Sequence, residues 1–408
     1  MDNKRHTLVF VTMTVFLDTV GFGIIMPVLP QFLMSLSEIT LAEASAIAGY
    51  LVVSYALLQF VFAPIIGNLS DRFGRRKVLL VSLAAFSINY LIAGLAATIW
   101  VLFIGRVLTG ITSATHATAN ALIADVSPPE ERAQNFGLMG VAFGLGFMVG
   151  PALGGIVGAI DIRLPFFLAA GLAALNTLYG FFVLKETLPE DRRRPFDWKR
   201  ANPVGMLLQV RKYPILIGLV AVMFIYNIGH HVYPSNWNFY TIEKFDWTPF
   251  EIGLSMGLVG IMAIFVQGYL IRKVIPLWGA PATAFIGFIV QAVAYLGIAF
   301  AGSSLALYVW CVASGFAGLV GPAVSGIMSN QVPQNEQGEL QGINASMGSI
   351  AAIIGPLLMT QSFTYFTGPE SPIYLPGIAF IIAGSLAILS LILFASNLRV
   401  LSPSGKTT

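Results

Sequence analysis

The chain consists largely of apolar runs, each about as long as a helix that crosses a lipid bilayer. Of its 408 residues, 56% are hydrophobic and 10% are charged, whereas soluble chains carry about a quarter charged residues. A bilayer core about 30 Å thick requires roughly 20 apolar residues in a helix. The runs are too long and uninterrupted for the alternating strands of a membrane barrel. We therefore predict an all-α integral membrane protein.

The apolar runs predict twelve spans, which places both ends of the chain on one side of the membrane. The predicted spans are 7–33, 45–67, 77–97, 99–124, 136–159, 164–184, 214–240, 249–271, 280–301, 304–329, 338–364 and 373–395. Lys and Arg gather in the even-numbered connections and the tails, and the opposite side holds only Arg163 and Lys244. Because cytoplasmic loops carry the excess of positive charge, we predict that both termini are cytoplasmic.

An internal repeat divides the chain into two halves. When the sequence is shifted by 205 residues, Pro128 falls on Pro333 and Gly150-Pro151 falls on Gly355-Pro356. Matches at one fixed offset imply two pseudo-symmetric halves with the same backbone plan, a plan used by transporters with a midplane site. We predict an N-terminal six-helix half at 1–184, a solvated cytoplasmic linker at 185–213 and a C-terminal six-helix half at 214–408.

Two opposite charges lie inside predicted spans. Asp18 lies roughly 16 Å from the cytoplasmic start of span one, and Arg106 lies roughly 10 Å from the opposite face of span four, so their depths are similar in a core about 30 Å thick. We predict that they face each other, directly or through water, and take part in proton coupling, because a lone membrane carboxylate is usually functional. A static pair that holds spans one and four together is the alternative. Residues predicted to weaken span one near its outer end are Gly21, Gly23, Pro27 and Pro30.

The connection between spans two and three reads GNLSDRFGRRK, residues 67–77. Its glycines permit a tight reversal, and its acid and arginines can form a charge network. Ordinary positive-inside charge and a basic nucleic-acid patch are the alternatives. The stretch resembles the signature loop of the major facilitator superfamily, G-x-L-x-D-R-x-G-R-R/K. The resemblance implies that Asp71 and Arg75 steady the outward-open state by ion pairing, with Asp125 as a partner. The other residues of this conformational switch are Gly67, Arg72 and Gly74.

Two further stretches carry the same resemblance. IGRVLTGITSA, residues 104–114, resembles the span-four motif of the superfamily, and GLGFMVGPALGG, residues 144–155, resembles its antiporter motif. In the second stretch, small residues permit close helix packing and Pro151 adds a bend. We assign Gly150 and Pro151 to the conformational switch. Generic packing of small residues is the alternative.

Polar and aromatic residues inside the spans are candidates for a substrate site. The stretch YNIGHHVYPSNWNFY mixes rings and amides as a ligand surface does, although an interfacial aromatic belt explains it equally well. Adjacent histidines point to different helix faces, so we predict no metal site. The candidate substrate-binding residues are Gln59, Asn89, His116, Asn120, Tyr226, Asn227, His230, His231, Trp237, Gln267 and Gln291.

The whole chain resembles the tetracycline-resistance branch of the drug:proton antiporters, most closely through FLDTVGFGIIMPVLP and GRVLTGITSATHA. Asp18 and Arg106 fall on positions that are functional in those antiporters. Asn89 and Gln291 stand where that branch has acids, and Ala263 stands where it has a histidine. The resemblance therefore implies the fold and the transporter class without naming tetracycline as the substrate.

We predict a secondary transporter that exports a small organic molecule in exchange for protons by alternating access. It would be a monomer in a bacterial inner membrane, with no cofactor and no nucleic-acid partner. The alternative is an importer or facilitator of a small organic anion without proton antiport. A membrane receptor is less favoured because no soluble relay domain is evident. An enzyme is not indicated, since the chain has no phosphate-binding loop, H-E-x-x-H or G-x-S-x-G motif. Cys311 is the single cysteine, which excludes an intrachain disulfide.

Overall fold

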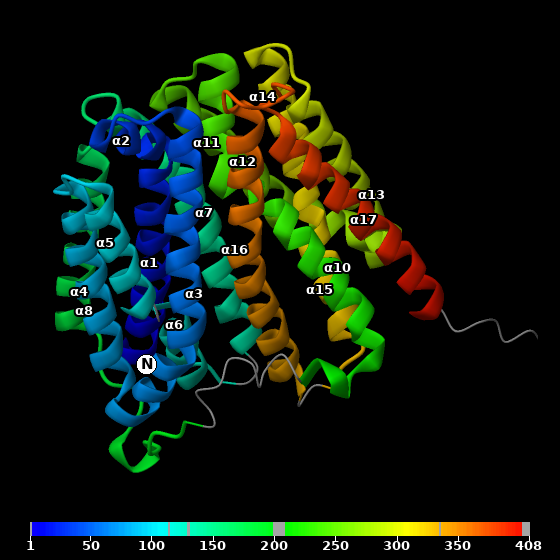
Figure 1. Cartoon of the computed structure of the whole chain (residues 1–408). Helices are drawn as coiled ribbons and strands as arrows, with labels where there is room; N and C mark the ends of the chain where they lie inside the picture. Colours follow the sequence, from blue (N-terminus) through cyan, green and yellow to red (C-terminus); the bar gives the residue numbers. More distant parts are fainter. Residues whose placement is uncertain (1, 113–114, 129–130, 199–208, 334–335, 402–408) are drawn as a thin grey trace, which may run out of the picture. The chain divides into compact units, whose positions relative to one another are not determined.

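The computed structural model describes residues 2–112, 115–128, 131–198, 209–333 and 336–401. Within these ranges the chain forms helices joined by short connections and no strands (Figure 1). Backbone N–H and C=O groups in a hydrocarbon core must be bonded within their own segment, so long apolar runs become helices. The predicted all-α class is confirmed.

Eleven helical segments make up the described chain before residue 213. They are α1 (Asp2–Ile25), η1 (Met26–Val28), α2 (Leu29–Leu36), α3 (Leu41–Phe73), α4 (Arg75–Gly94), α5 (Ile99–Thr112), α6 (Thr115–Val126), α7 (Arg132–Gly158), α8 (Leu164–Val183), η2 (Glu190–Arg192) and η3 (Gln209–Lys212). The later helices are α10 (Pro214–His230), α11 (Val232–Phe245), α12 (Pro249–Phe265), η4 (Val266–Leu270), α13 (Ile271–Ala299), α14 (Ser304–Gly315), η5 (Phe316–Leu319), α15 (Val320–Ser329), α16 (Gln337–Thr367) and α17 (Ile378–Leu401).

Among the described residues, ten helical stretches are long and apolar enough to cross a membrane. One of them, Pro249–Ala299, has 51 residues and holds two spans, separated near Gly279, whose φ of 78° is not helical. Predicted span four lies in α5 and α6, on either side of residues 113–114. Together these segments account for the twelve predicted spans. The predicted connection between spans eight and nine is helical up to Gly279, because α13 begins at Ile271.

The helices form two compact units. Unit 1 comprises Met1–Ala44, Tyr50–Pro203 and Trp247–Gly260, and unit 2 comprises Ser45–Gly49, Val204–Asp246 and Ile261–Thr408. The boundaries read from the sequence repeat, at residues 184 and 213, stay a prediction. Each unit is described by itself below.

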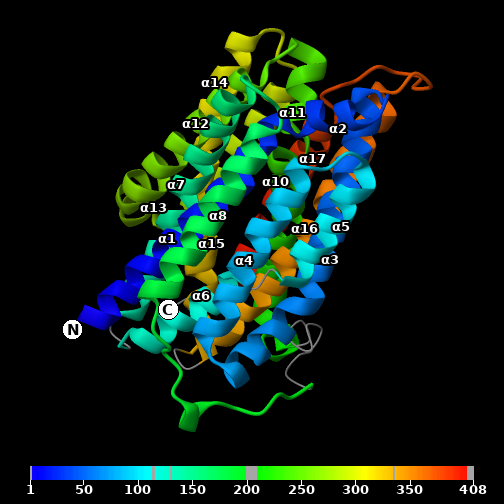
Figure 2. The same ribbon diagram turned by 90° about the vertical axis from the view of Figure 1, so that its left-hand side faces the viewer.

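In unit 1, α1 lies against α6, α7 and α8, and α4 lies against α5, α6 and α8 (Figure 2). Its core contains Phe10 and Val15 of α1, Leu83 of α4 and Leu122 of α6, none of them more than 1% exposed. Because α1 has neighbours on several sides, a polar residue in its middle lies deep in the unit.

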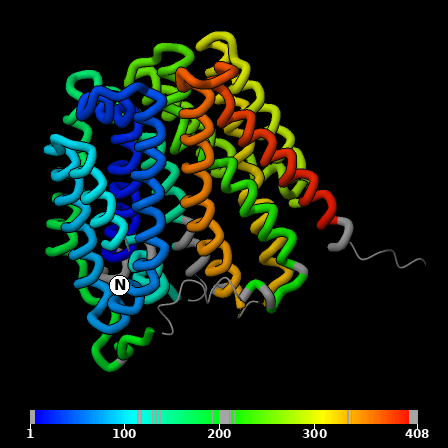
Figure 3. Tube along the Cα trace, in the orientation of Figure 1, coloured from blue at the N-terminus to red at the C-terminus, as the bar shows by residue number. Residues whose placement is uncertain are grey.

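In unit 2, α17 packs on α10, α13 and α16, and the Cα trace follows these long helices side by side (Figure 3). Its core contains Phe288, Val320, Ile343 and Phe394, which are fully buried. Helix α11 continues the line of α10 after a break at His231 and packs on α16.

The regular α-helix of span one is interrupted at Pro27, as the proline in the sequence led us to predict. Regular helix ends at Ile25, and the 3-10 turn η1 contains Pro27. Gly21 and Gly23 instead lie inside regular helix. Both glycines leave room for a side chain of a neighbouring helix. At Gly21 an ideal Cβ would lie 3.1 Å from Tyr90 Oη, and at Gly23 it would lie 2.7 Å from Pro151 Cδ.

Candidate functional site

Asp18 lies in the middle of α1, and close packing with α7 holds that part of the helix in place. An ideal Cβ at Gly146 of α7 would lie 2.8 Å from the Phe16 carbonyl oxygen and 2.7 Å from Thr19 Cβ. On another side, Thr115 of α6 lies beside the Asp18 carboxyl, although its buried hydroxyl does not meet hydrogen-bond geometry. The Asp18 side chain is half-buried. The carboxyl is thus deep in unit 1 yet partly accessible.

Arg106 and two tyrosines complete an electrostatic group around Asp18. Tyr90 of α4 interacts with both Asp18 and Arg106, and Arg106 interacts with Tyr90 and Tyr55. Gly110, one turn after Arg106, brings α5 against α3, since its ideal Cβ would lie 2.8 Å from the Tyr55 carbonyl oxygen. We call these four residues, Asp18, Tyr55, Tyr90 and Arg106, the Asp18 group.

The two charges of the Asp18 group make no direct ion pair in the described part of the chain. Tyr90 interacts with both of them instead. Sequence reasoning missed Tyr90 and Tyr55. One signal could have identified Tyr90, because the 205-residue shift places it on Tyr295, an aromatic residue of the other half that also lies near a titratable group.

The other polar candidates of unit 1 lie in different surroundings. Asn89, next to Tyr90, is 6% exposed, Gln59 is half-buried and Asn120 is exposed. The side chain of His116 lies outside the described residues.

The antiporter-like stretch of α7 forms part of a stripe of glycines that faces α1. Ideal Cβ atoms would lie 2.8 Å from the Val20 carbonyl oxygen at Gly150, 2.1 Å from the Ile24 carbonyl oxygen at Gly154 and 2.2 Å from Val28 Cγ1 at Gly158. With Gly146, these glycines recur every fourth residue. Gly155 and Pro151 face the first part of α12, where a Cβ on Gly253 would lie 2.4 Å from the Pro151 carbonyl oxygen. The stripe sets the height and rotation of the helix that carries Asp18.

The glycine stripe leads to a prediction with a control in the same motif. We expect Gly154→Ala to lower the melting temperature of the detergent-purified protein by several degrees, because overpacking against backbone costs about 1–3 kcal/mol. Gly144→Ala is expected to change it by less than about 1 °C, since a Cβ at Gly144 meets nothing within 4 Å. Equal melting temperatures for the two variants would show that α1 does not approach α7 this closely.

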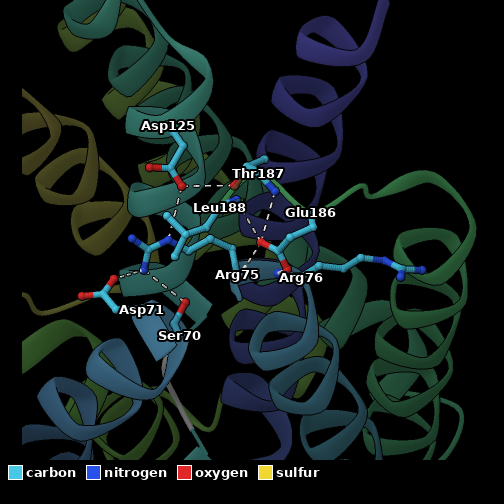
Figure 4. Close-up of polar contacts among 8 residues, drawn as sticks. All are labelled: Ser70, Asp71, Arg75, Arg76, Asp125, Glu186, Thr187 and Leu188. Atoms are coloured by element: carbon cyan, nitrogen blue, oxygen red, sulfur yellow. Dashed lines mark hydrogen bonds and ion pairs between the residues drawn. The ribbon is translucent and has the colours of Figure 1, made fainter. Parts of the chain in front are cut away.

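Arg75 is the centre of the predicted conformational switch (Figure 4). Its Nη1 lies 2.5 Å from Asp71 Oδ1, and its Nε lies 3.3 Å from Asp125 Oδ2. Nη1 also donates a hydrogen bond of 3.3 Å to Ser70 Oγ. Only 12% of the Arg75 side chain is exposed, against 33% of Asp71 and 24% of Asp125. The network joins the end of α3, the start of α4 and the end of α6.

The remaining switch residues divide into two kinds. Gly74 has φ of 99°, a conformation that requires glycine at the reversal from α3 to α4. At Gly67 a Cβ would meet nothing within 4 Å, so close helix approach is not its role. Arg72 is exposed, and its guanidinium lies 5.1 Å from the centre of the Phe73 ring.

Glu186 and Thr187 also join this network, and sequence reasoning missed both. The two carboxylate oxygens of Glu186 accept hydrogen bonds from the backbone N–H groups of Arg75 at 2.9 Å and Arg76 at 3.2 Å. Thr187 Oγ1 donates to Asp125 Oδ2 at 3.1 Å. These residues follow α8 directly, where we expected a solvated linker. One signal could have identified Glu186. It is an acid just after the end of predicted span six, on the same predicted side of the membrane as the arginine-rich loop 67–77.

In unit 2 the histidine-aromatic stretch forms a cluster with α13. The His230 ring is stacked on Tyr226 with centroids 6.0 Å apart and meets Tyr233 edge-on at 5.9 Å. Its Nδ1 lies 3.5 Å from Tyr295 Oη. We call these four residues the His230 cluster. His230 itself remains exposed.

The His230 cluster brings two more candidates together. Trp237, 1% exposed, packs on Tyr233 at 5.7 Å between ring centroids. Gln291, also 1% exposed, lies beside the Tyr233 hydroxyl, and its Nε2 has no hydrogen-bond partner. Of the other candidates, Asn227 and His231 are half-buried and Gln267 is exposed. Tyr233, which also hydrogen-bonds Ser314, was missed although it lies in the quoted stretch.

Among the described residues, no group of three or more His, Cys, Asp or Glu side chains could hold a metal ion. Cys311, which the sequence shift matches to Arg106, is a free, buried thiol. The chemistry available in the described sites is therefore protonation, ion pairing, hydrogen bonding and ring stacking.

Comparison with known proteins gives consistent matches over the whole chain. The family model of the Major Facilitator Superfamily matches residues 11–356 and again 275–407. The class C tetracycline resistance protein of Escherichia coli is 36% identical over 95% of this chain and 96% of its own length. The class H protein of Pasteurella multocida is 34% identical over 88% and 90%. The crystal structure of the human organic anion transporter MFSD10 (TETRAN) has a TM-score of 0.73 at 23% identity, over 96% of this chain and 99% of that one.

Proposed function

Because the chain belongs to the major facilitator superfamily, in the tetracycline-resistance branch of its drug:proton antiporters, we propose that it exports a small organic molecule in exchange for protons. It would do so by alternating access, with the substrate site reached first from one side of the membrane and then from the other. The relatives named above are tetracycline resistance proteins, and tetracycline is therefore the first compound to test.

One observation carries the proton-coupling part of the proposal. Asp18 lies deep in unit 1, partly accessible, and makes no ion pair with Arg106. A carboxylate in a direct ion pair would stay ionised. A carboxylate that interacts with the same tyrosine as the cation, without pairing with the cation itself, can bind or release a proton when its surroundings change. In this proposal Asp18 binds the proton, and Arg106 and Tyr90 set the electrostatic field in which it does so.

The proposed substrate surface in unit 2 is the His230 cluster with Trp237 and Gln291. The stacked, exposed imidazole of His230 and the unpartnered Nε2 of Gln291 suit a flat ring system that carries hydrogen-bonding groups at its edge. Gln291 stands where the tetracycline branch has an acid, so this surface contains no carboxylate. We therefore propose a planar organic compound, bound in unit 2 without a metal chelate, as the substrate class.

A substitution in the proposed substrate surface should change the affinity for the substrate and not the coupling to protons. We expect Tyr226→Leu to raise the KM for export about 5-fold, since loss of a ring stack costs about 1 kcal/mol, while the pH dependence stays unchanged. Tyr269→Leu is the matched control, because Tyr269 is 58% exposed and, among the described rings, stacks on Phe265. A Tyr226→Leu protein with unaltered KM would remove the His230 cluster from the substrate path.

We further propose a monomer in a bacterial inner membrane with both termini in the cytoplasm, which the excess of Lys and Arg on one side supports. The second candidate function is facilitated movement of an organic anion without protons. It is favoured by Arg106, a deep cation whose charge no direct ion pair offsets in the described structure.

Everted membrane vesicles that contain the protein separate the two functions. The vesicles are energised, lumenal acidity is followed with a pH-sensitive dye, and planar compounds are added, with and without Mg²⁺ for tetracycline. Proton release on addition of a compound supports antiport. Movement of a labelled organic anion that neither releases protons nor depends on the proton gradient supports the facilitator.

A further inference from the structure

Helix α4 begins without a cap of its own. Its N-cap is Gly74, which has no side chain to accept a hydrogen bond, and its first turn contains no acidic residue. That turn instead reads Arg75-Arg76-Lys77. Free N–H groups and the positive end of the helix dipole favour a negative charge at this position. Three cations there are unfavourable unless an anion is supplied from elsewhere.

Glu186 supplies that anion from 111 residues further along the chain. Its Oε1 accepts the Arg75 N–H at 2.9 Å and its Oε2 accepts the Arg76 N–H at 3.2 Å, as Figure 4 shows. Oε1 also accepts the N–H groups of Thr187 and Leu188 at 3.1 Å each. These last two bonds fix the direction of the carboxylate, so it meets α4 already oriented.

The shape of the reversal fits the same carboxylate. An ideal Cβ at Gly74 would lie 2.3 Å from Glu186 Oε2 and 2.8 Å from its Cδ. Any side chain at this position would occupy the space that the carboxylate fills. Glycine at the start of α4 is thus required twice, by its φ of 99° and by the approach of Glu186.

We propose that Glu186 is a positioning residue of the transport cycle, which caps α4 and so holds Arg75 within reach of Asp71 and Asp125. The neighbouring Thr187 extends this contact, because its hydroxyl shares Asp125 Oδ2 with Arg75 Nε. The end of α8 therefore belongs to the switch as much as the motif loop does. The inference rests on the proposed transport function for its kinetic consequence but not for the cap itself.

The test compares three variants of the full-length protein. Glu186→Gln replaces one acceptor oxygen by a donor, Glu186→Asp keeps the charge on a shorter stem, and Glu190→Gln is the control. Glu190 lies in the same segment, its side chain is 88% exposed, and among the described residues it pairs with Arg193. Amide hydrogen exchange of the peptide that contains residues 75 and 76 is measured in detergent, and Vmax and KM are measured in vesicles.

In Glu186→Gln we expect the backbone amides at the start of α4 to exchange hydrogen about 10-fold faster than in the wild type. We also expect Vmax to fall about 10-fold with KM unchanged, in line with the loss of a charged hydrogen bond. Glu186→Asp should lie between it and the wild type, and Glu190→Gln should match the wild type. Unchanged exchange in Glu186→Gln would overturn the cap, and faster exchange with unchanged Vmax would overturn the positioning role. A wild-type protein that moves no compound would overturn the proposed function, while the exchange measurement would still decide the cap.

Discussion

The Asp18→Asn variant is expected to lose compound-driven proton release by at least about 100-fold, the lower range for removal of an essential proton-transfer group. An amide has nearly the same size as the carboxyl but cannot take up a proton at physiological pH. Binding of the compound should persist, because Asp18 is the proposed proton site and the proposed substrate surface lies in unit 2. Proton release is followed with a pH-sensitive dye, and binding is followed by exchange of labelled for unlabelled compound across the membrane.

The control for this variant is Asp161→Asn. Asp161 is an exposed carboxylate of unit 1 that accepts the Arg163 N–H at 2.7 Å, so its loss should leave proton release at the wild-type level. If Asp18→Asn released protons as the wild type does, Asp18 would be a structural residue and the coupling group would have to be sought elsewhere.

The second large effect is expected at Arg75. Arg75→Ala removes the guanidinium that joins Asp71 to Asp125, and we expect Vmax to fall about 10-fold, which corresponds to about 1.4 kcal/mol. The effect should be smaller than for a fully buried pair because both carboxylates are partly exposed. Arg75→Lys keeps the charge but not the planar fork and should recover only part of the rate. Initial rates of export over a range of compound concentrations give Vmax and KM for each variant.

Lys77→Ala serves as the control for a positive charge in the same turn of α4. Lys77 is exposed and forms no ion pair with another described residue, so its removal should leave Vmax unchanged. Equal losses in Arg75→Ala and Lys77→Ala would mean that general positive charge, and not the network, matters at this loop.

The spans could be predicted from the sequence because hydrophobic length is a local property. The break in span one could be predicted from Pro27 for the same reason, since a proline removes a backbone donor wherever it stands. The pairing of Arg75 with Asp71 is also local, four residues apart on one turn. Depth along two spans was enough to suggest that Asp18 and Arg106 belong to one group.

The residues that were missed have partners far away in the chain. Tyr90 joins Asp18 and Arg106 because α4 packs on α5 while the Tyr90 side chain reaches α1 at Gly21, and no spacing within α4 marks it. The described start of the predicted linker is not freely solvated, since Asn68 Nδ2 donates to the Asp197 carbonyl at 2.6 Å and the Arg194 N–H donates to the Asp71 carbonyl at 3.2 Å. From the sequence, a charge-rich connection is predicted to be solvent-exposed, because partners over 100 residues away in the chain leave no local signal.

The most direct test of the central claim uses purified protein in sealed liposomes, with no other transport protein present. A gradient of a compound identified in vesicles is imposed at equal pH on both sides, and the internal pH is recorded. Proton-coupled exchange predicts that protons move against the compound, so the compartment that loses compound becomes more acidic, and that Asp18→Asn abolishes the pH change. Full dissipation of the compound gradient with constant internal pH in the wild type would contradict proton antiport and leave the anion facilitator as the account of this chain.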